Sequence, residues 1–171
     1  MKEAAITFIV ACAVACAGYD AANAKEAART GIQTACSLLR IDELEKLLHV
    51  PLANGVEDGS ACTYEFAGKA AGPTFRINVH WIGGRDEVDG ARAGAAMAKS
   101  FKGTRMGDSM VDSEPLTGIG DDAIVVKAGG MLILYARKGD ASIEVEAFGA
   151  KPEELIPIAK IALSRLQPES R

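Results

Sequence analysis

The stretch Leu116–Phe148, LTGIGDDAIVVKAGGMLILYARKGDASIEVEAF, contains three short runs rich in valine, isoleucine and leucine. The runs are separated by Ala128-Gly129-Gly130 and Lys138-Gly139-Asp140, and glycine supplies the positive φ that tight hairpin turns need. In the last run apolar and polar residues alternate, which is the period of a strand with one buried face. The stretch therefore predicts an antiparallel meander with strands at 122–127, 131–137 and 142–148.

The composition is that of a folded domain. The chain has 171 residues, of which 49% are hydrophobic and 25% are charged. A net charge of −4 disfavours binding to nucleic acid or to an acidic membrane surface. Aromatic residues make up only 5%, which argues against a stacking platform for single-stranded nucleic acid.

Residues 1–24 have the features of an export signal. The apolar run Ala4–Ala17 is shorter than the ~20 residues that span a bilayer, and Gly18 ends it. Ala22-Asn23-Ala24 is a small-x-small sequence that a signal peptidase accepts, so cleavage is expected between Ala24 and Lys25. The protein is then periplasmic or secreted, without a transmembrane span. The alternative is a lipid anchor at Cys16, because the preceding residues loosely resemble a lipobox.

The remaining chain reads as one domain at 36–167, with a flexible lead-in at 25–35 and a tail at 168–171. No proline-, serine- or glycine-rich linker divides it. Cys36 and Cys62 are left as an even pair in an oxidising compartment, so we expect them to form a disulfide. A redox pair or a metal site would need Cys-x-x-Cys spacing or further ligands nearby, and the sequence has neither.

Outside the meander, the patterns predict two strands and three helices. The strand 61–66 places Cys62, Tyr64 and Phe66 toward the core. In the strand 74–82, the side that faces the core consists of Phe75, Ile77, Val79 and Trp81. The opposite side of this strand carries Arg76, Asn78 and His80. The helices are expected at 42–50, 86–101 and 155–166. In the second helix Gly90, Gly94 and Ala98 recur at four-residue spacing, which we interpret as close packing on the sheet. The predicted fold is α+β, an antiparallel sheet of about five strands with three helices packed mainly on one face.

Several of these motifs together resemble a group of small exported bacterial proteins of unknown function. They are Cys36-Ser37-Leu38-Leu39, Cys62-Thr63-Tyr64, Gly118-Ile119-Gly120-Asp121-Asp122-Ala123, the Lys138-Gly139-Asp140 turn and the closing helix Ile158–Leu166. The resemblance implies a fold similar to the PsbP-like α+β type and often a lipoprotein. The chain departs from the pattern at Arg40, where a capping Thr or Ser is usual, and at His49, where a terminal Gly is common. The resemblance implies no catalytic residue.

No catalytic, cofactor-binding or metal-binding residue is predicted. His49 at a helix end and His80 on a strand are too scattered to form a metal site. Gly118-Ile119-Gly120-Asp121 lacks the third glycine and the Lys-Ser/Thr pair of a nucleotide loop, so a turn is expected.

The function class favoured by these observations is a non-enzymatic cell-envelope binding or accessory module, either monomeric or weakly oligomeric. Its partner would be an envelope protein or a small ligand, and no cofactor is expected. One alternative is a periplasmic hydrolase that uses His80 or His49 with a carboxylate. Another is an inhibitor of an envelope protein, acting through a loop at 67–73 or 102–114.

Overall fold

The computed structural model describes residues 33–65, 67, 75–100 and 111–167. The predicted signal peptide, its cleavage site at Ala24 and Lys25, Cys16 and the tail at 168–171 lie outside these residues, as do Phe66 and most of both proposed inhibitory loops. The elements begin with the 3-10 helix η1 (Ala35–Leu38), α2 (Ile41–Leu48), β1 (Val56–Asp58), β2 (Ala61–Tyr64), β3 (Phe75–His80) and α3 (Gly84–Ser100). They continue with β4 (Asp112–Leu116), β5 (Asp122–Ala128), β6 (Met131–Lys138), β7 (Ala141–Phe148) and α4 (Pro152–Arg165).

The described strands form one antiparallel sheet in the order β1-β2-β3-β7-β6-β5-β4. The predicted meander is confirmed as β5, β6 and β7, with positive φ at Gly129, Gly130 and Gly139 in the two turns. The α+β class is also confirmed. The expected number of about five strands is wrong, because the sheet has seven strands.

The two additional strands, β1 and β4, are the edges of the sheet. β1 has only three residues, all exposed, and it lies between Gly55 and Gly59, in a segment whose Asn and Gly content favours turns. β4 contains Asp112, Glu114 and Pro115, which are poor strand formers. Such residues are found at edges because proline and charge there discourage pairing with another chain.

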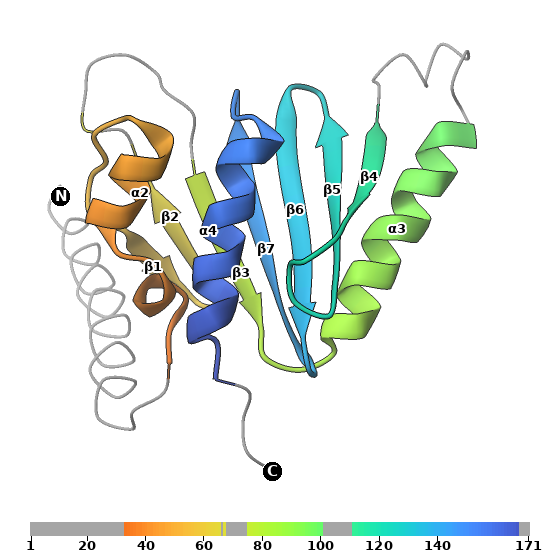
Figure 1. Cartoon of the computed structure of the whole chain (residues 1–171), viewed down its shortest axis with the longest axis horizontal. Coiled ribbons are helices and arrows are strands. Elements are labelled where there is room, and N and C mark those ends of the chain that lie inside the picture. Colours follow the sequence, from red (N-terminus) through yellow and green to blue (C-terminus); the bar gives the residue numbers. More distant parts are fainter. Residues whose placement is uncertain (1–32, 66, 68–74, 101–110, 168–171) are drawn as a thin grey trace, which may run out of the picture. The chain divides into compact units, whose positions relative to one another are not determined.

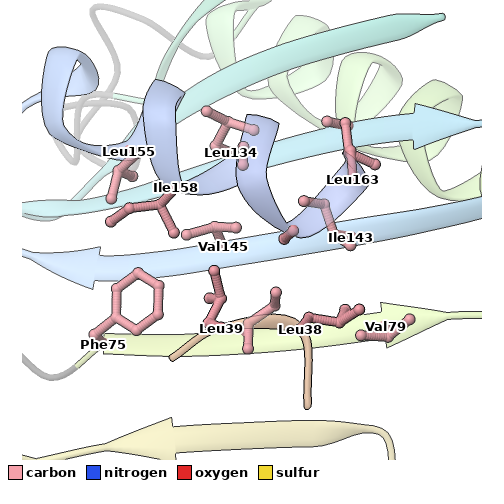
Figure 2. Close-up of a cluster of buried hydrophobic side chains, with 14 of the residues drawn as sticks. Leu38, Leu39, Phe75, Val79, Leu134, Ile143, Val145, Leu155, Ile158 and Leu163 are labelled. Atoms are coloured by element: carbon pink, nitrogen blue, oxygen red, sulfur yellow. The ribbon is translucent and has the colours of Figure 1, made fainter. Parts of the chain in front are cut away.

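The main core lies between the sheet and α4. Leu155, Ile158, Ala159, Ala162 and Leu163 of α4 are buried, as the helical spacing predicted. Figure 2 shows side chains from η1, β3, β6, β7 and α4 converging in this layer. Most of the apolar area that drives folding is removed from water here.

The N-terminal helices are attached to this core by a disulfide and an ion pair. Cys36 of η1 is bonded to Cys62 of β2, with Cα atoms 5.0 Å apart, so the predicted disulfide is present. Arg165 of α4 donates to Glu43 of α2 through Nη1 at 2.7 Å and to the Leu38 carbonyl at 3.0 Å. Hydrogen bonding to Arg165 lowers the pKa of Glu43.

The helix α3 lies on the opposite face from α2 and α4. Val88 and Ala95 pack on Ile124 and Val126, which alternate along β5 with the main-core residues Ala123 and Val125. In Figure 1, α4 crosses in front of the central strands and α3 lies to the right, beside β4. The expectation that the helices share mainly one face therefore holds only for α2 and α4.

Gly90 and Gly94 of α3 do not pack on the sheet as expected. Gly90 and Gly94 are exposed, and a methyl group added at either would meet no atom within 4 Å. The helix instead uses Val88 and Ala95 as its inner side. The helix begins at Gly84, two residues before the predicted start, and Asp86 lies in its first turn.

Candidate functional site

Half of the sheet face on the α3 side carries polar side chains. Arg76, Asn78 and His80 of β3 are half-buried and point away from the main core, as the alternation predicted. β7 continues this surface, because its residues pair directly with those of β3. We use the name polar face for Arg76, Asn78, His80, Tyr135, Ser142, Glu144 and Glu146, which pair across β3, β7 and β6.

The path of α3 leaves one end of the polar face uncovered by that helix. A Cβ added to Gly84 would lie 2.6 Å from the Ala141 carbonyl carbon, so the helix begins directly against the start of β7. Its last turn is over β4, where Lys99 Nζ donates to the Ser113 carbonyl at 3.1 Å. His80 and Ser142 lie at the end of the strands where α3 begins, and Arg76 and Glu146 lie at the other end.

Arg76 and Glu146 are neighbours that do not form an ion pair. They are Cα partners on adjacent strands, and both are half-buried. Within the described part of the chain neither side chain makes a hydrogen bond or an ion pair, and Arg76 Nε is fully buried without an acceptor. Burial raises the pKa of Glu146, and so does the negative charge of Glu144, whereas Arg76 opposes the shift.

Glu144, in contrast, is held in place. Asn78 Nδ2 donates to its Oε2 at 3.3 Å, and the Tyr135 hydroxyl bonds to it from the other side. Burial and this bond to Glu144 raise the pKa of Tyr135, so the phenol remains a neutral donor. Glu144 is thus a fixed acceptor beside the unpaired Arg76 and Glu146.

His80 lies next to a carboxylate, as the hydrolase hypothesis requires. Its Nδ1 lies 3.5 Å from Glu87 Oε1 of α3. Its Nε2 is buried without a partner, and the same is true of Oγ of its strand partner Ser142. Ser142 is only 1% exposed and does not hydrogen bond to His80, so His80 is not placed to take the proton of this hydroxyl.

His49 and the glycine-rich motif have structural roles. His49 is exposed and ends α2 in the left-handed conformation (φ 56°), where glycine would be the usual choice. Gly120 has φ +59°, and Asp121 Oδ2 accepts from the backbone amide of Gly139 at 2.7 Å. Gly118–Asp121 therefore forms a bend that supports the β6–β7 turn.

A cavity of about 190 Å³ lies on the α4 side of the sheet. Leu48, Phe75, Ala147, Gly149, Ala150 and Glu154 line it. The only charged group among these residues, Glu154, already accepts from the Lys151 amide at 2.8 Å. The cavity thus offers no charged group that is free of a protein partner among its lining residues.

Arg76, Tyr135, Glu144 and Glu146 were not predicted as site residues. The alternation in β3 and β7 places Arg76 and Glu146 on non-core faces, and this was the available signal. Their proximity depends on the pairing of β3 with β7, which are separated along the chain by α3 and the whole meander. The sequence pattern contains no information on that pairing.

No group of three or more His, Cys, Asp or Glu side chains suitable for a metal ion occurs among the described residues. No helix in the described ranges is long and apolar enough to cross a membrane. No protein-family model, curated protein or solved structure matches the chain.

Proposed function

We propose that this domain is a non-enzymatic ligand-binding module and that the polar face is its binding site. The observation that carries the proposal is the pair Arg76 and Glu146, two adjacent half-buried charges that are not joined to each other. A buried polar group without a partner is costly, and such groups are rare in folded proteins. A ligand that supplied the missing acceptor and donor would remove this cost.

The cell envelope is the proposed location. The export signal predicted at residues 1–24 supports it, and a disulfide between Cys36 and Cys62 is compatible with an oxidising compartment. The resemblance to small exported bacterial proteins agrees with this location. In this setting the module would take a small ligand rather than nucleic acid, because the chain is acidic and the polar face contains two glutamates.

The proposal is tested by titrating the ¹⁵N-labelled domain with four small probes: leucine, succinate, putrescine and glucose. We expect at least one probe to shift the backbone amides of Arg76, Asn78, Glu144 and Glu146 in a saturable way. Amides on the outer side of α4, such as that of Lys160, provide the internal control. If no probe shifts the polar face, the proposal is contradicted.

Hydrolysis is the second candidate, because His80 and Glu87 lie 3.5 Å apart. A general base must reach the proton it removes directly or through one water, and the buried Nε2 of His80 has no partner to offer. Hydrolysis of p-nitrophenyl acetate by the wild type and by His80→Gln distinguishes the two functions. If the domain is a binding module, the wild type and the variant should hydrolyse the ester at the same background rate. A large decrease in the hydrolysis rate of the variant would support an enzyme.

A further inference from the structure

The charges on the polar face specify what a ligand must carry. The guanidinium of Arg76 is a planar donor that matches a carboxylate, and its buried Nε lacks an acceptor. Glu144 and Glu146 are acceptors two residues apart on β7, and the charge of Glu144 disfavours ionisation of Glu146. An ammonium group has three donors and a positive charge, so it would satisfy both carboxylates.

The spacing of these groups places the two ligand charges close together. Arg76 and Glu146 are Cα partners on neighbouring strands, which lie about 4.8 Å apart. A ligand that reaches both must carry its carboxylate and ammonium within a few ångströms of each other. A dicarboxylate would leave Glu146 without a donor, and a diamine would leave Arg76 without an acceptor.

An apolar surface borders the charged pair on the side of β6. Ile133 is the β6 partner of Glu146, and Met131 is the partner of Phe148. Phe148 lies two residues beyond Glu146 on the same side of β7 and is 50% exposed, and Met131 and Ile133 are half-buried. These three side chains offer a partly exposed apolar contact next to the charges.

We propose that the polar face binds a free α-amino acid with an apolar side chain. Its carboxylate lies on Arg76, its ammonium lies between Glu144 and Glu146, and its side chain lies against Met131, Ile133 and Phe148. This inference rests on the proposed function, because it names the ligand class of the same site. Asn78 and Tyr135 act as positioning residues that hold Glu144.

The experiment follows L-leucine binding by the ¹⁵N-labelled domain and by calorimetry. Leucine is expected to shift the amides of Arg76, Met131, Ile133, Glu146 and Phe148. N-acetylleucine, which lacks the ammonium group, and leucinamide, which lacks the carboxylate, should each bind at least about tenfold more weakly, as should glycine. Equal affinity for leucine and either blocked form would overturn the proposal.

Two variants and two matched controls test the residue assignments. Arg76→Gln and Glu146→Gln should each weaken leucine binding about tenfold or more. Arg85→Gln and Glu153→Gln remove exposed charges elsewhere, on α3 and α4, and should leave the affinity unchanged. A dispersed spectrum of each variant establishes that it is folded, and either variant alone suffices if the other does not fold.

The remaining outcomes separate this inference from the proposed function. If succinate, putrescine or glucose shifts the polar face and leucine does not, the ligand class is wrong and the binding module stands. If none of the probes shifts it, both proposals are wrong.

Discussion

At the scale of single residues, the fold depends on a few positions where only one residue type fits. Gly120 combines a φ of +59° with a backbone so close to β6 that an added Cβ would lie within contact distance of the Arg137 carbonyl oxygen. That carbonyl accepts from the Asp121 amide at 2.8 Å. Gly94 is the opposite case, a glycine in the exposed side of α3 with no conformational or steric requirement.

The same substitution should therefore have opposite effects at these two glycines. Gly120→Ala should lower the free energy of unfolding by about 1–3 kcal/mol, because alanine is strained at positive φ and meets the Arg137 backbone. Gly94→Ala should raise it by up to ~1 kcal/mol, because alanine favours a helix interior. Urea denaturation of both variants checks the pair. A neutral Gly120→Ala or a destabilising Gly94→Ala would be inconsistent with this structure.

Glu146 should make stability depend on pH. Burial and the charge of Glu144 raise its pKa in the folded protein above the ordinary value for a glutamate. The folded state thus binds this proton more tightly than the unfolded state, and the resulting stabilisation is complete below the unfolded pKa. It is lost as the pH rises through the folded pKa.

Glu146→Gln removes this dependence. The variant should be more stable than the wild type at pH 7, and the difference should shrink when both are measured at pH 4. Glu153→Gln, at an exposed position in the first turn of α4, is the matched control and should not show this trend. Thermal denaturation at the two pH values is sufficient, and a variant that is less stable at pH 7 would contradict the assignment.

At the scale of elements, the sequence predicted the strands and helices whose order of apolar and polar residues shows which side is buried. β6, β7 and α4 were predicted because each has one buried side with a clear period, and β5 was predicted because it is a short, continuous apolar run between turns. β1 and β4 were not predicted at their observed positions, because edge strands bury few side chains and therefore show no alternation of apolar and polar residues. Glu57, Asp112 and Pro115 are also residue types that are uncommon in strands. The face chosen by α3 was also not predictable, since both faces of β5 are apolar.

The attachment of η1 and α2 should depend on the disulfide. Both elements are shorter than the ~12–15 residues at which isolated helices become stable. Replacing Cys36 and Cys62 by serine should lower the free energy of unfolding by about 3–4 kcal/mol in the chain-entropy model. Hydrogen exchange should show early loss of protection in η1 and α2, while β6 and β7 remain protected. If protection from hydrogen exchange is lost equally in all strands of the sheet, the disulfide supports the whole domain instead.

At the scale of the whole molecule, the sheet is covered on one side by α4, and α3 packs mainly against β4–β7 on the other. The polar face is produced by this arrangement together with the pairing of β3 and β7. Sequence alternation placed Arg76 on the non-core side, but only the strand order places it beside Glu146. The candidate site was therefore not predictable from local patterns, although the alternation assigned its β3 and β7 residues to the correct side of their strands.

The central claim is that Arg76 and Glu146 are present for a ligand and not for the fold. The most direct test is the free energy of unfolding of the double variant Arg76→Met, Glu146→Gln, measured by urea denaturation without ligand. Because neither side chain has a partner among the described residues, the variant should be as stable as the wild type or more stable by ~1 kcal/mol. A loss of more than about 3 kcal/mol would show that the two side chains support the fold, and it would contradict the claim.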